Sequence, residues 1–137
     1  MIFLLDLGNE SLNRCLFDTK AEKKYRTYTD KRKSEGEYLL LRKQYLAFEN
    51  VKEEEIEGAI LASVVPSRTN RIKNAVSKLI KKECLIVNKT LKTGLAIRMD
   101  NPGEVGSDLL CNCVGALSLG LKDYFIADLN SVSSFIV

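Results

Sequence analysis

Two segments of the chain place an aspartate at the end of an apolar stretch and follow it with turn-forming residues. The first reads Phe3-Leu4-Leu5-Asp6-Leu7-Gly8-Asn9, and the second reads Phe125-Ile126-Ala127-Asp128-Leu129-Asn130-Ser131. A tight turn between two strands can direct backbone N–H groups at a phosphate. The aspartate beside such a turn can hold a metal ion or a metal-bound water. Two such segments in one small protein therefore indicate a site that grips the phosphates of a nucleotide.

A third carboxylate, Asp108, follows Gly106-Ser107 at the expected start of a helix. Aspartate is common at the N-cap of helices, and from this residue alone the N-cap is the favoured interpretation. A carboxylate in a cleft near a phosphate donor could instead take the proton of a substrate hydroxyl. Because the chain has no histidine, any acid–base chemistry must rely on carboxylates, lysines or tyrosines.

Seven short strands are expected around these residues. Antiparallel strands come first, and the apolar run 59–65, between Gly58 and Pro66, predicts a buried parallel strand. The expected strands cover residues 2–5, 12–17, 25–29, 59–65, 85–87, 124–127 and 132–137. Antiparallel strands followed by strand–helix units predict an α/β fold, in which helices pack on a mixed sheet.

Three helices are expected between the strands. Ser34 and Glu37 have the spacing of a capping box, and the helix that follows is predicted to bury one face made of Tyr38, Leu41, Tyr45 and Phe48. A second amphipathic helix carries apolar residues at helical spacing, namely Ile72, Val76, Leu79 and Ile80. The third helix is expected from about residue 108 to residue 119, where Gly120 stops it.

Composition narrows the class of protein. The 137 residues carry a net charge of only +3, and the basic cluster 31–33 is short, so a dedicated nucleic-acid binder is not expected. No apolar run approaches the roughly 20 residues of a membrane span, and the N-terminus lacks the pattern of an export signal. The four cysteines are therefore interpreted as reduced thiols of a cytoplasmic protein.

Six short motifs, taken in order and spacing, resemble those of the type III pantothenate kinases. They are Asp6-Leu7-Gly8-Asn9, Thr29-Asp30-Lys31-Arg32, Ser63-Val64-Val65-Pro66, Lys92-Thr93-Gly94-Leu95, Asp100-Asn101-Pro102, and Glu104-Val105-Gly106 with Asp108. The resemblance implies an actin-like ATPase fold of the acetate-and-sugar-kinase type, built from ribonuclease-H-like halves. It assigns residues 1–120 to the N-terminal half-domain and residues 121–137 to the first strands of the second half. In the family, ATP phosphorylates pantothenate to 4'-phosphopantothenate, the first step of coenzyme A biosynthesis.

The resemblance also implies roles for individual residues. The ATP phosphate loop would consist of Asp6, Leu7, Gly8, Asn9, Glu10, Ser11, Leu12 and Asn13, and Ser131 would also contact ATP. Asp108 would be the catalytic base, and the pantothenate pocket would include Met99, Gly106, Ser107, Asp108 and Leu109. Asp6 would hold Mg²⁺, and Asp128 would hold a monovalent cation, K⁺ or NH₄⁺. A homodimer is implied, with no nucleic-acid or membrane partner.

Four positions differ from the pattern of the family, which has a hydroxyl residue at position 10, a tyrosine at 99, an arginine at 109 and a glycine at 130. Here they are Glu10, Met99, Leu109 and Asn130. A carboxylate at position 10 would repel phosphate oxygens, and a leucine cannot supply the bidentate grip of an arginine. Members of the family are also considerably longer. Two interpretations therefore stay open: a type III pantothenate kinase, or a truncated, non-catalytic paralogue that acts as a binding or dimerisation module.

Overall fold

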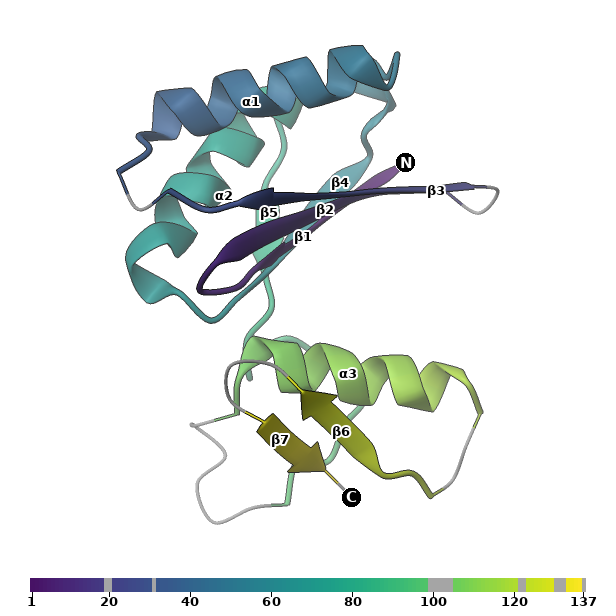
Figure 1. Cartoon of the computed structure of the whole chain (residues 1–137). Helices are drawn as coiled ribbons and strands as arrows, with labels where there is room; N and C mark the ends of the chain where they lie inside the picture. Colours follow the sequence, from purple (N-terminus) through teal and green to yellow (C-terminus); the bar gives the residue numbers. More distant parts are fainter. Residues whose placement is uncertain (19–20, 31, 99–104, 121–122, 130–132, 137) are drawn as a thin grey trace. The chain divides into compact units, whose positions relative to one another are not determined.

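The computed structural model describes residues 1–18, 21–30, 32–98, 105–120, 123–129 and 133–136. The chain forms two compact units, residues 1–86 and residues 87–137 (Figure 1). The order of strands and helices is the one predicted from the sequence, with one added 3-10 turn, η1 (Glu53–Glu55). The division at residue 120, which refers to the halves of a longer fold, stays a prediction.

The first unit contains a five-stranded mixed sheet. Its strands are β1 (Ile2–Leu7), β2 (Ser11–Asp18), β3 (Ala21–Tyr28), β4 (Gly58–Ser63) and β5 (Cys84–Ile86), in the spatial order β3-β2-β1-β4-β5. The first three pair antiparallel, whereas β4 runs parallel to both β1 and β5. The mixed sheet and the parallel strand predicted for residues 59–65 are both confirmed.

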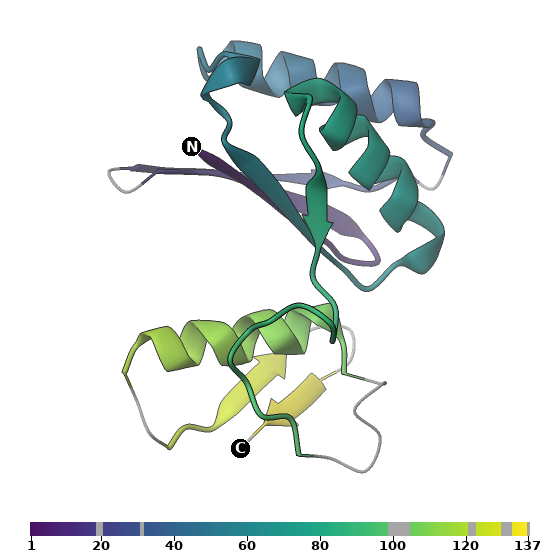
Figure 2. The same ribbon diagram turned by 180° about the vertical axis from the view of Figure 1, so that it is seen from behind.

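Two helices, α1 (Glu35–Phe48) and α2 (Pro66–Ile80), cover the same face of this sheet (Figures 1 and 2). Side chains alternate between the two faces of a strand, and along β1 the residues Phe3, Leu5 and Leu7 are buried in the core. Asp6, between two of these residues, therefore projects from the opposite face and is exposed. The core thus lies on the helix side, and the carboxylate lies on the other.

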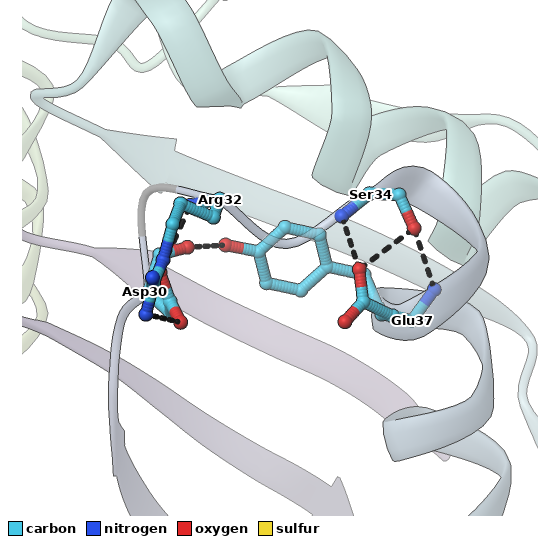
Figure 3. A network of polar contacts seen from close by, with 5 residues as sticks. Asp30, Arg32, Ser34 and Glu37 are labelled. Carbon is cyan, nitrogen blue, oxygen red and sulfur yellow. Dashed lines mark hydrogen bonds and ion pairs between the residues drawn. The ribbon is translucent and has the colours of Figure 1, made fainter.

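The start of α1 is fixed by the capping box predicted from the sequence (Figure 3). The Glu37 N–H donates to the Ser34 hydroxyl at 3.3 Å, and the Ser34 N–H donates to the Glu37 carboxylate at 2.7 Å. Just upstream, the Asp30 carboxylate accepts from the Arg32 N–H at 2.9 Å, and the Tyr38 hydroxyl donates to the Asp30 carbonyl at 3.3 Å. These contacts tie the segment that leaves β3 to the first turns of the helix.

The buried face of α1 differs from the prediction. Tyr38 and Tyr45 are buried as expected, but Leu41 is 38% exposed and Phe48 is 71% exposed. Arg42 and Leu46 are buried beside the tyrosines instead. The buried stripe is therefore rotated from the predicted one, because the Arg42 guanidinium lies over the Tyr38 ring and enters the core. A count of apolar residues does not anticipate a buried arginine.

The second unit contains α3 (Ser107–Ser118) and an antiparallel pair of strands, β6 (Ile126–Leu129) and β7 (Ser133–Ile136). The strand predicted at 124–127 begins two residues later than expected, and Phe125, just before it, stacks on Phe135 with ring centroids 5.8 Å apart. In the part of the chain that the structure describes, no helix has the length and apolar character needed to cross a bilayer.

Candidate functional site

The hairpin between β1 and β2 carries the first aspartate. Its turn is closed by the Gly8 N–H, which donates to the Ser11 carbonyl at 2.9 Å. Asp6 was predicted to follow the strand. It is instead the penultimate residue of β1, because its backbone pairs with Asn13 in β2. The Asn13 amide nitrogen donates to the Asp6 carboxylate at 2.9 Å. This hydrogen bond orients the carboxylate on the face of the sheet that the helices leave uncovered.

Within the predicted phosphate loop, the side chains have different surroundings. Leu7 and Leu12 are buried in the core, and Ser11 is also buried. Asn9 and Glu10, at the tip, are exposed. Only the tip and the Asp6–Asn13 pair therefore offer side chains to a ligand, while the leucines anchor the strands.

The hairpin tip is held by two distant residues. The Thr29 N–H donates to the Glu10 carbonyl at 2.8 Å, and the Thr29 hydroxyl donates to the Asn9 carbonyl at 3.2 Å. The Arg68 guanidinium donates to the same Asn9 carbonyl at 3.0 Å. Sequence reasoning did not single out Arg68, because 59 residues separate it from Asn9 and only tertiary structure brings them together.

The Ser63-Val64-Val65-Pro66 motif places Arg68. Pro66 is the first residue of α2, a position where its fixed backbone angle suits a helix. The Ser63 hydroxyl accepts from the Val65 N–H at 3.2 Å and lies 2.7 Å from the Thr69 hydroxyl. This tight connection from β4 to α2 brings the first turn of the helix to the hairpin.

A cavity of about 800 Å³ lies beside the hairpin tip in the first unit. It is lined by Asn9, Glu10, Tyr28, Thr29, Val65, Ser67, Arg68 and Arg71. The carboxylate that replaces a hydroxyl at position 10 therefore shares its surroundings with two guanidinium groups.

In the second unit, Asp108 is not the N-cap that the residue alone suggested. The N-cap of α3 is Gly106, and Asp108 is the second residue of the helix. Its carboxylate is half-buried and accepts from the Leu109 N–H at 2.9 Å. A Cβ atom on Gly106 would collide with this carboxylate oxygen. Glycine at position 106 therefore leaves the space that the Asp108 carboxylate occupies.

Asp128 repeats the arrangement of Asp6. It is the penultimate residue of β6, which pairs antiparallel with β7, and the Asn112 amide nitrogen donates to its carboxylate at 3.0 Å. Each aspartate thus accepts a hydrogen bond from an asparagine amide, although Asn13 lies in the paired strand β2 and Asn112 lies in α3. Asn130 and Ser131, which follow β6 in the sequence, lie outside the described residues, and so does Met99.

Leu109 lines a smaller cavity of about 360 Å³ in the second unit. Its lining is mainly apolar and includes Val105, Leu110 and Phe135, with Arg98 as the charged member. Gly106, Ser107 and Asp108, which the resemblance placed in the same pocket as Leu109, are not part of this lining, and Ser107 is buried.

Comparison with sequence models of known families shows to which family the chain belongs. The sequence model of the type III pantothenate kinase family matches residues 2–131. This chain belongs to that family. The five-stranded mixed sheet with its helices is consistent with the actin-like, ribonuclease-H-like kinase fold that the resemblance implied. By family resemblance the chain is a kinase, and the family acts in coenzyme A biosynthesis.

The residues present fit the metal ions that pantothenate kinase chemistry implies. Mg²⁺ usually binds one or two carboxylates and completes its shell with water and substrate phosphates. The Asp6 carboxylate, which the Asn13 amide nitrogen orients, offers one such ligand, and the Asp128 carboxylate, which the Asn112 amide nitrogen orients, offers another. Among the described residues, no three acidic, histidine or cysteine side chains gather around one point. A metal at either aspartate would therefore depend on phosphate and water for its remaining ligands.

Proposed function

We propose that this chain supplies the phosphate loop and the catalytic base of an ATP-dependent pantothenate kinase. The observation that carries the proposal is the family match over residues 2–131. The chain keeps Asp6, Asp108 and Asp128 at the matching motifs, each oriented by a hydrogen bond. The substrates would be ATP and pantothenate, with Mg²⁺ and K⁺ or NH₄⁺, in the cytoplasm and as a homodimer.

In the proposed reaction, the terminal hydroxyl oxygen of pantothenate forms a bond to the γ-phosphorus of ATP, and the bond from that phosphorus to the β,γ-bridging oxygen breaks to release ADP. The Asp108 carboxylate accepts the hydroxyl proton. The hairpin tip binds phosphate oxygens through backbone N–H groups, and Asp6, oriented by the Asn13 amide, would hold Mg²⁺. When bound, the metal neutralises charge on the phosphates.

The experiment that tests this proposal is product formation by the full chain. We expect mass spectrometry to detect 4'-phosphopantothenate after incubation with ATP, Mg²⁺, K⁺ and pantothenate, and to detect none when pantothenate is left out. A folded chain that forms no product, beside an active member of the family assayed in parallel, would refute catalysis by this chain.

A second candidate function, a non-catalytic binding or dimerisation module, is favoured by Leu109. The family has an arginine there, whereas here the side chain lines a mainly apolar cavity. A leucine cannot form the charged hydrogen bonds of a guanidinium. Size-exclusion chromatography with light scattering, on the chain alone and mixed with an active homologue, tests this candidate. A chain that stays monomeric in both samples would exclude it.

A further inference from the structure

The carbonyl of Asn9, at the tip of the β1–β2 hairpin, accepts two hydrogen bonds. One comes from the Thr29 hydroxyl at 3.2 Å, and the other comes from the Arg68 guanidinium Nη2 at 3.0 Å. Thr29 follows β3 and Arg68 lies in the first turn of α2. Two elements that are distant in sequence thus hold one peptide group.

Holding this carbonyl also sets the direction of an N–H group. In a trans peptide, the carbonyl of one residue and the N–H of the next point in opposite directions. The chain has no cis peptide among its described residues, so fixing the Asn9 carbonyl toward Arg68 directs the Glu10 N–H to the opposite side. An N–H held in this way at a turn is the kind of donor that binds an anion.

The burial of Arg68 indicates that its side chain does more than fill space. Arg68 is only 3% exposed, and within the described part of the chain its Nη1 has no hydrogen-bond partner. A buried guanidinium with an unused donor is unfavourable, so an apolar side chain would suit packing at least as well. What the arginine adds is the bond to Asn9. A charged donor on the carbonyl also polarises the peptide and strengthens its N–H as a donor.

We propose that Arg68 is a positioning residue for the bound nucleotide, which orients the Asn9–Glu10 peptide so that the Glu10 N–H meets a phosphate oxygen of a nucleoside triphosphate. Thr29 assists through its hydroxyl. The inference rests on the proposed function, because it takes the hairpin as the phosphate loop. It adds a residue from a different element, which acts through the backbone and not by touching the ligand.

The test compares the wild-type 137-residue chain with R68M, R68Q and R71M. Arg71 lines the same cavity and is exposed, so R71M removes an equal charge without removing the bond to Asn9. Titration calorimetry measures the dissociation constant of Mg·ATP, and NMR-detected exchange measures the Gly8 and Thr29 amides, both of which donate within the hairpin contacts.

We expect R68M to weaken Mg·ATP binding at least about tenfold, as the loss of a charged hydrogen bond predicts, and to speed exchange of both amides. R68Q, whose amide can still donate to the Asn9 carbonyl, should stay between R68M and the wild type. R71M should stay within about twofold of the wild type, as expected for an exposed charge.

The outcomes separate this inference from the proposed function. The positioning role would be overturned if R68M bound Mg·ATP as tightly as the wild type, or if R71M lost as much affinity as R68M. Unchanged amide exchange in R68M would also overturn it, whether or not nucleotide binds. If the wild type bound no Mg·ATP and R68M still showed faster amide exchange, the proposed function would be overturned. The conclusion that Arg68 fixes the hairpin tip would be retained. If R68M does not fold, T29V decides, because it removes the second donor to Asn9 and should weaken binding in the same direction.

Discussion

At the scale of single residues, Arg42 is fully buried in the core of the first unit. Its Nη1 donates to the Tyr38 carbonyl at 2.9 Å, and its guanidinium lies over the Tyr38 ring at 5.2 Å. Within the described residues, Nε and Nη2 have no hydrogen-bond partner. Burial, and then the charge of Arg14, lower the pKa of Arg42 to about 10, so the group is still charged at neutral pH.

We therefore predict that R42M stabilises the protein. Replacing buried ion pairs by apolar side chains of similar volume often gains about 1–4 kcal/mol, and here a buried charge with two unpaired donors would disappear. Urea denaturation at pH 7 measures the change in the free energy of unfolding. R32M is the matched control, since the Arg32 side chain is 91% exposed, and it should change stability by less than about 0.5 kcal/mol. A loss of stability in R42M comparable to that of a core truncation would contradict this account.

The residues of the site differ in how far the sequence could reveal them. Asp6, Asp108 and Asp128 could be found because each follows a local pattern of strand, turn or helix start. Arg68 could not, because its role depends on a contact with Asn9 across 59 residues. The N-cap interpretation of Asp108 was wrong because Gly106 takes the N-cap position.

At the scale of elements, the sequence predicted best where the determinants are local. The capping box of Ser34 and Glu37 needs only their spacing and was confirmed. The buried stripe of α1 was predicted less well, because Tyr38, Arg42 and Tyr45 also recur at helical spacing. Which stripe faces the sheet is decided by stacking and packing against other strands, information that the helix sequence alone does not contain.

The capping box gives a prediction for α1. Its Ser34 side chain satisfies a backbone N–H that has no partner within the helix, so S34A should destabilise the protein by about 1 kcal/mol. S34D, which keeps a side-chain acceptor at the N-cap, should lie close to the wild type. Thermal unfolding followed by circular dichroism measures both variants. Equal melting temperatures for S34A and the wild type would show that the cap contributes no stability.

At the scale of the whole molecule, the two compact units differ in how much core each one contains. The hydrophobic cluster of buried residues, with Phe3, Leu61 and Ile72 among its members, lies entirely within residues 1–86. In the described part of residues 87–137, the buried apolar side chains are Val87 and Leu110. A two-stranded sheet with one helix and so small a core is marginal by itself.

We predict that a polypeptide of residues 1–86 folds alone and unfolds cooperatively in urea, because it retains the five-stranded sheet and both covering helices. A polypeptide of residues 87–137 should show no cooperative transition. Tryptophan is absent from the chain, so circular dichroism is the appropriate probe. A non-cooperative transition for residues 1–86 would contradict the assignment of an independent core to this unit.

The measurement that tests the central claim most directly is a comparison of turnover and nucleotide affinity in D108N. If Asp108 accepts the proton of the pantothenate hydroxyl, D108N should lower kcat by about 10²- to 10⁴-fold, while the dissociation constant of Mg·ATP stays close to that of the wild type. The exposed Asp123 provides the control, and D123N should retain full turnover. Full activity of D108N would contradict the account, because another group would then have to accept the proton.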